Sequence, residues 1–172
     1  KADGTITHEN VDLNTVEPDA EAAAYIQTIT DKFDALQKQV VAKTSVELTI
    51  NGADGKRAVR NAETNLGDLC ADAYRILLGA DIAFVNGGGV RDNIKVGDIT
   101  YGDIIKVHPF GNEACLVEVT GQQIKDALEL GSAAYPGESG GFLQVSGLTY
   151  TINADIPSSV VKNDKSEFVK VD

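Results

Sequence analysis

The stretch Ala83-Phe84-Val85-Asn86-Gly87-Gly88-Gly89-Val90-Arg91 joins a short apolar run to an asparagine, three glycines and an arginine. The apolar run, which starts at Ile82, has the length and the β-branched residues of a buried strand. Glycine lets another group approach the backbone closely, so the run that follows indicates either a tight turn or a ligand-binding loop. Arg91 adds a planar cation that suits a carboxylate or a phosphate. A turn with a solvated arginine explains this stretch alone equally well.

The chain has 172 residues and a formal net charge of −11, with 42% hydrophobic and 24% charged residues. This size suits one domain, or one domain with an appendage, and it can bury a core without cross-links. The negative charge disfavours nucleic acid and anionic membrane as partners, but it allows a mononucleotide in a local cationic pocket. No apolar run is long enough to span a membrane, and no signal peptide is recognisable. Because the sequence starts at Lys1 and has no methionine, we expect a processed product, an excised domain or a trimmed sequence.

Hydrophobic spacing and turn residues predict the order of the elements. Residues 1–18 are polar and read as a linker, and apolar residues at helical spacing predict a long helix over residues 19–42, either an interdomain connector or the first core helix. Up to the glycine run, we predict a strand over 44–50, a helix ending at Gly79 and a strand over 80–85. After it, we predict a short helix capped by Thr100, a strand over 114–119 and a helix capped by Thr120. The last predicted elements are a strand over 142–152 interrupted at Gly147 and a strand over 168–171. We therefore expect an α/β (α+β) fold in which layered mixed β-sheets are covered by helices.

The sequence offers little for catalysis. Cys70 and Cys115 both sit in apolar contexts, which favours buried thiols over a disulfide. No histidine or cysteine pair has metal-ligand spacing, and Ser139 matches Gly-x-Ser-x-Gly without the strand-to-helix turn that a nucleophile needs. We therefore assign no catalytic and no metal-binding residue, and we expect this polypeptide alone to be inactive.

A binding site is better supported. Arg60 and Arg91 adjoin turn segments, and Asn86 and Asn112 lie where strands and loops meet. Phe110 stands between a proline and a glycine, where a ring can offer its face, although a ring buried under a turn fits the same pattern. Two arginines, two amides and an aromatic ring suit a planar base with negatively charged substituents.

Six blocks of residues follow one another between about Val46 and Ile152. The blocks are Arg60-x-x-Glu63-Thr64-Asn65-Leu66-Gly67-x-Leu69-x-Ala71-Asp72-Ala73, Asn86-Gly87-Gly88-Gly89-Val90-Arg91, Gly97-Asp98-Ile99-Thr100-Tyr101, Pro109-Phe110-Gly111-Asn112, Thr120-Gly121 and Phe142-Leu143-Gln144-Val145-Ser146-Gly147. In this order they resemble the C-terminal domain of the 5′-nucleotidase family, which includes ecto-5′-nucleotidases, periplasmic UDP-sugar hydrolases and 2′,3′-cyclic-nucleotide phosphodiesterases.

The resemblance implies a division of labour. An N-terminal metallophosphatase domain of the same protein would hold two divalent metal ions and hydrolyse the phosphate ester, and a long helix would join it to a substrate-binding domain. On that basis residues 1–43 are a polar lead and linker helix, and residues 44–172 are an incomplete substrate-binding domain. The family's nucleotide contacts fall on Arg60, Asn86, Arg91, Phe110, Asn112 and Gly140.

The resemblance covers only part of such an enzyme, and a second function stays open. The metal domain and the family's closing stretch, which supplies a second stacking ring, are absent from this sequence. An extracellular, periplasmic or cell-surface location follows from the resemblance alone. The alternative function is a non-catalytic nucleoside-binding or cell-surface interaction module on the same scaffold.

Overall fold

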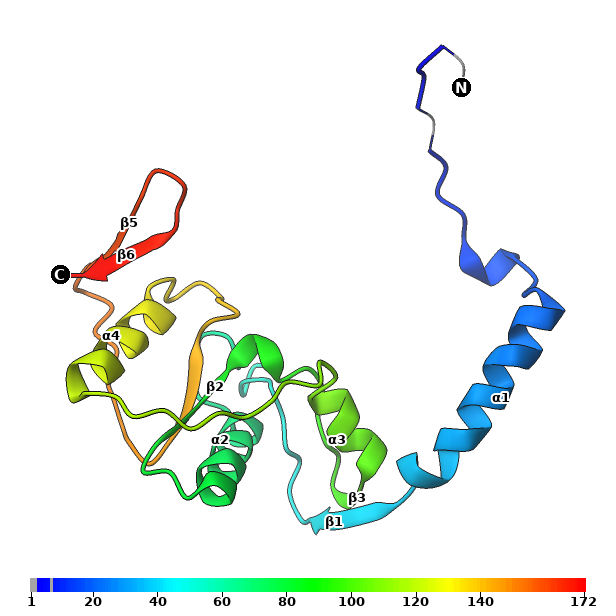
Figure 1. Cartoon of the computed structure of the whole chain (residues 1–172), viewed down its shortest axis with the longest axis horizontal. Coiled ribbons are helices and arrows are strands. Elements are labelled where there is room, and N and C mark those ends of the chain that lie inside the picture. Colours follow the sequence, from blue (N-terminus) through cyan, green and yellow to red (C-terminus); the bar gives the residue numbers. More distant parts are fainter. Residues whose placement is uncertain (1–2, 7) are drawn as a thin grey trace.

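A core of short helices and paired strands carries a helical arm on one side (Figure 1). The computed structural model describes residues 3–6 and 8–172, so part of the predicted polar lead lies outside the described residues. A 3₁₀ turn, η1 (Leu13–Thr15), precedes the arm helix α1 (Ala20–Gln37). The Asp19 carboxylate begins α1 by accepting a hydrogen bond of 2.8 Å from the Ala22 amide. No residue of α1 is buried.

The predicted helix over residues 19–42 is wrong at its end, because Val40–Thr44 form strand β1. β1 pairs antiparallel with β3 (Gly97–Thr100), and two successive β-branched valines begin it. The predicted strand over residues 44–50 is also displaced, since only Thr44 of that range belongs to β1. Leu48 instead forms an isolated bridge with Ile94, through hydrogen bonds of 2.9 and 2.8 Å.

The core lies between α2 (Asn65–Leu78) and the antiparallel pair of β2 (Ala83–Asn86) and β4 (Leu143–Ser146). The Thr64 hydroxyl caps the start of α2, and Gly79 ends the helix in the left-handed conformation, as predicted. The predicted strand over residues 142–152 is confirmed only up to Ser146. The buried residues of the core cluster are Val59, Leu66, Cys70, Ala71, Val85, Val90, Ile94, Ile99 and Val107.

The remaining elements surround this core. The 3₁₀ turn η2 (Gly87–Gly89) follows β2, and α3 (Tyr101–Val107) and α4 (Gly121–Ser132) both begin with the capping boxes of Thr100 and Thr120. β5 (Val160–Lys162) and β6 (Phe168–Val171) form a hairpin against α4, which confirms a strand at the end of the chain. The α/β class is confirmed, and in the described part of the chain the sheets are three antiparallel pairs.

The predicted strand over residues 114–119 does not form. These residues are exposed, and no backbone hydrogen bond joins residues 113–119 to another described residue. They face β2 across a cavity of about 1110 Å³. Cys115 is therefore exposed and the prediction of a buried thiol is wrong there, whereas Cys70 is buried; both thiols are free.

Candidate functional site

The glycine-rich turn packs against two other loops at backbone distance. The Gly87 amide donates to the Phe142 carbonyl at 2.7 Å, and a Cβ at Gly87 would lie 1.9 Å from the Val59 carbonyl oxygen. The Gly88 amide donates to the Gly140 carbonyl at 2.9 Å, and a Cβ there would lie 2.9 Å from the Gly140 Cα. The glycines thus serve close approach of backbones as well as turning the chain.

A buried glutamine fixes the loop that begins at Val59. Gln144 in β4 is 2% exposed, and its amide nitrogen donates to the carbonyls of Val59 and Ala62 at 3.1 and 2.7 Å. Its amide oxygen accepts from the Thr64 amide at 3.1 Å. All three interactions fall on the segment that carries Arg60, so that segment is rigidly attached to the sheet.

Arg60, Asn86 and Gly140 meet around the loop of residues 136–141. The Ser139 amide donates to the Arg60 carbonyl at 2.9 Å, and the Asn86 side-chain amide donates to the Gly140 carbonyl at 3.1 Å. The Arg60 guanidinium makes no hydrogen bond and no ion pair with any described residue. It is therefore available to an external anion.

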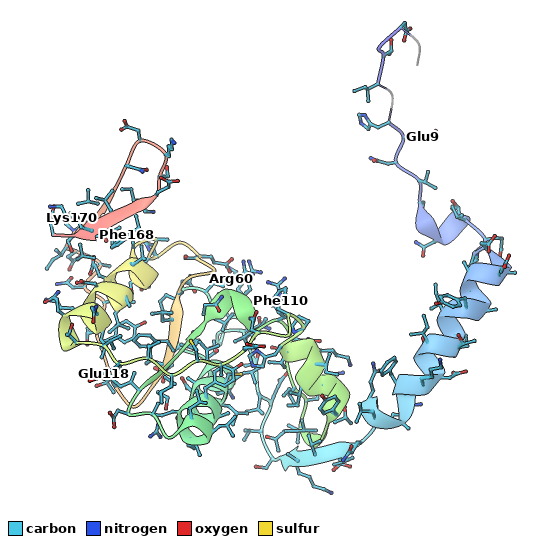
Figure 2. All side chains as sticks on the ribbon, viewed as in Figure 1. Glu9, Arg60, Phe110, Glu118, Phe168 and Lys170 are labelled. Atoms are coloured by element: carbon cyan, nitrogen blue, oxygen red, sulfur yellow. The ribbon has the colours of Figure 1, made fainter. Side chains whose placement is uncertain are left out.

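Arg91 and Phe110 form the other side of the site. The Arg91 Cζ lies 5.8 Å from the centroid of the Phe110 ring, and Arg91 Nη1 donates to the Gly88 carbonyl at 3.3 Å. Phe110 is 59% exposed, so an aromatic surface stands beside a cation. Figure 2 shows Arg60 and Phe110 along the same upper edge of the core.

Five of the six predicted site residues are thus joined by a chain of contacts through the glycine turn. Asn112 is exposed and makes no such contact with another described residue. It lines the large cavity together with Asn86 and His108.

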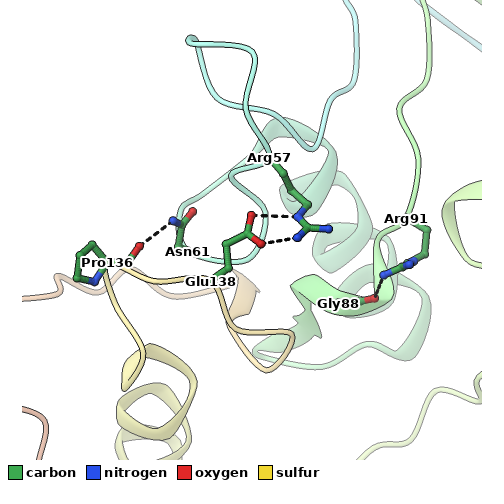
Figure 3. A network of polar contacts seen from close by, with 6 residues as sticks. All are labelled: Arg57, Asn61, Gly88, Arg91, Pro136 and Glu138. Atoms are coloured by element: carbon green, nitrogen blue, oxygen red, sulfur yellow. Dashed lines mark hydrogen bonds and ion pairs between the residues drawn. The ribbon is translucent and has the colours of Figure 1, made fainter.

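An ion pair that the sequence pattern did not indicate holds the loop of residues 136–141 (Figure 3). The Arg57 guanidinium binds both carboxylate oxygens of Glu138, with Nε at 3.0 Å from Oε1. The hydrogen bond from Arg57, the largest cause, lowers the pKa of the Glu138 carboxyl. The Asn61 side chain also donates to the Pro136 carbonyl at 3.0 Å. Because 81 residues separate Arg57 from Glu138, no local motif could have linked them.

Cys70 and Ser139 are nucleophilic side chains that have partners within the chain. Burial raises the pKa of the Cys70 thiol to about 12, and the Cys70 Sγ lies 3.2 Å from Nε2 of His108. Burial also lowers the pKa of His108. The Ser139 hydroxyl accepts a hydrogen bond from the Gly141 amide at 3.1 Å. Over residues 3–6 and 8–172, no three His, Cys, Asp or Glu side chains gather as metal ligands would, and no helix is long and apolar enough to cross a membrane.

Comparisons with known proteins agree with this fold. Residues 40–169 match the family of 5′-nucleotidase C-terminal domains. The chain is 39% identical over 140 residues to the trifunctional nucleotide phosphoesterase YfkN of Bacillus subtilis, covering 78% of this chain and 9% of that protein. It is 42% identical over 110 residues to a 5′-nucleotidase of Vibrio cholerae, covering 64% of this chain and 20% of the relative.

Solved structures share the fold of this chain. The crystal structure of a 5′-nucleotidase precursor from Thermus thermophilus superimposes with a TM-score of 0.70 at 36% identity, covering 88% of this chain and 31% of that one. The NAD nucleotidase of Haemophilus influenzae shares the fold, with a TM-score of 0.52 at 22% identity, and the match covers 90% of this chain and 30% of that protein. This chain belongs to the family of 5′-nucleotidase C-terminal domains. It spans less than a third of the length of each of these proteins.

Proposed function

We propose that this chain is the substrate-binding domain of a metal-dependent phosphohydrolase of the 5′-nucleotidase type, which acts in nucleotide catabolism. One observation carries the proposal: a guanidinium without a partner among the described residues, Arg60, and an exposed aromatic ring, Phe110, flank the same glycine turn. Family membership supplies the class of ligand, and the side chains present suit a nucleotide or nucleoside.

Each residue then has a separate role in binding. The Phe110 ring stacks on the base, and the amides of Asn86 and Asn112 bind polar groups of the base or sugar. Arg60 and Arg91 bind negatively charged phosphate oxygens, while Gly140 brings the backbone of its loop close to the ligand. The site holds and orients a substrate, and its described residues include no group positioned to cleave one.

Hydrolysis belongs to a metallophosphatase domain that we propose for the same protein, where two divalent metal ions would activate the attacking water. In this arrangement residues 1–43 are the lead and linker, with α1 as the linker helix, and residues 44–172 are the substrate-binding domain. The contribution of this chain to the rate is to position the phosphate ester at those metals. We also propose a secreted or periplasmic location for the protein.

The proposal is tested by an NMR titration of this chain with adenosine and with AMP, beside the variant Phe110→Ala. We expect shifts at Asn86, Phe110 and Gly140, and binding weakened about fivefold or more in the variant, because stacking a base on one ring is worth roughly 1–3 kcal/mol. Shifts confined to other surfaces, or equal binding by the variant, would contradict a nucleoside site and favour an interaction module instead.

A further inference from the structure

The loop of residues 136–141 carries the Glu138 carboxylate, whose charge is felt by Arg60, the cation that we propose binds phosphate. Glu138 immediately precedes Ser139, whose amide donates to the Arg60 carbonyl at 2.9 Å. The hydrogen bond from Arg57 is the main cause of the lowered pKa of Glu138, and the attraction of Arg60 adds to it, so the Arg60 and Glu138 charges are within electrostatic reach. A carboxylate in this position competes with any anionic ligand for the Arg60 guanidinium.

In the structure a second arginine, Arg57, binds this carboxylate. Both oxygens of Glu138 are occupied by Arg57 in a two-pronged pair, the geometry that an arginine fork makes best (Figure 3). The Arg60 guanidinium consequently has no partner among the described residues. The side chains of Arg57 and Glu138 are 44% and 36% exposed, and ion pairs in such positions are weak. Glu138 can therefore exchange Arg57 for Arg60 when Arg57 is removed.

We propose that Arg57 is a positioning residue: by engaging Glu138, it keeps that carboxylate off Arg60 and leaves the Arg60 guanidinium free for an anionic oxygen of the ligand. This inference rests on the proposed function for the identity of the ligand. The pairing itself is a property of the free chain.

The first experiment measures that pairing without any ligand, by following the Glu138 side-chain carboxyl by NMR as a function of pH. In Arg57→Ala the pKa of Glu138 should stay below its ordinary value, because Arg60 takes over the carboxylate. In the double variant Arg57→Ala/Arg60→Ala it should return to its ordinary value. An ordinary pKa already in Arg57→Ala would overturn the inference, whether or not the chain binds nucleotides.

The second experiment compares dissociation constants for AMP and adenosine. Arg57→Ala should weaken AMP binding by roughly two- to fivefold, the range of exposed ion pairs, and leave adenosine binding unchanged. Glu138→Gln should not weaken AMP binding, and Arg57→Ala/Glu138→Gln should restore it. Lys43→Ala, which breaks the surface pair with Asp98, is the control for loss of one positive charge.

The pattern of results separates the explanations. If Arg57 only braces the loop, then Glu138→Gln weakens AMP and adenosine as much as Arg57→Ala does, and the double variant restores nothing. If the wild-type chain binds neither ligand, the proposed function fails while the carboxyl titration still decides the pairing.

Discussion

At the scale of single residues, Gly87 is the most tightly enclosed glycine of the site. Its missing side chain lets the turn after β2 touch the carbonyl of Val59, and the β2–β4 ladder fixes the strand that leads into the turn. A methyl group there meets backbone, which cannot rotate away as a flexible side chain can.

We predict that Gly87→Ala lowers the free energy of unfolding by about 1–3 kcal/mol, because a Cβ 1.9 Å from the Val59 oxygen forces the backbones apart. Urea denaturation measures the loss. Gly121→Ala is the matched control, since nothing lies within 4 Å of a Cβ at that first position of α4 and alanine favours a helix. Equal stability of the two variants would show that the turn can move.

The residues of the site differ in how far the sequence could predict them. The glycine run and the arginine beside it are adjacent in the chain, so their pattern predicts a tight approach and an anion-binding group. The Arg57–Glu138 pair and the three hydrogen bonds of Gln144 span 80 residues or more, and nothing local marks them. Such contacts depend on the fold as a whole.

At the scale of elements, helices were more predictable than strands. Thr64, Thr100 and Thr120 each accept a hydrogen bond from an amide three residues ahead, so the signal for a helix start lies within one turn of chain. A strand needs a partner that the sequence does not name. Residues 40–44 pair with strand β3, whereas the alternating residues 114–119 pair with no strand of the described chain.

The unpaired segment predicts a difference between the two thiols of this chain. Cys115 is exposed, while Cys70 is buried and its pKa of about 12 keeps it protonated. We expect an aromatic disulfide reagent to modify one thiol quickly under native conditions and the second only after unfolding. Cys115→Ser should abolish the fast phase. Two thiols that react together would mean that residues 114–119 are covered, or that α2 opens readily.

At the scale of the whole molecule, stability should depend on the protonation of one carboxyl. Burial, with the charge of Glu63 nearby, raises the pKa of Asp68 to about 6 in the folded chain. The folded state therefore holds this proton more tightly than the unfolded state does. The resulting stabilisation is complete below the ordinary pKa of an aspartate and is lost as the pH rises through about 6.

We predict that Asp68→Asn, which cannot ionise, raises the melting temperature at pH 7.5 relative to the wild type and leaves it nearly unchanged at pH 3.5. Calorimetry at several pH values measures the difference between the two proteins. Asp164→Asn removes the same charge from the exposed β5–β6 turn and should show a smaller effect at pH 7.5. A difference that does not vary with pH would contradict the assignment to Asp68.

The backbone contact between the glycine turn and the Val59 and Gly140 loops also sets a rule for exchanging parts between related proteins. Three segments that touch through main-chain atoms leave no side chain to absorb an inserted residue, so their lengths are tied together. The turn between β5 and β6 lies at the surface and carries no such constraint. A graft of this site onto another member of the family therefore has to move all three loops as one unit, whereas the hairpin can be lengthened by itself.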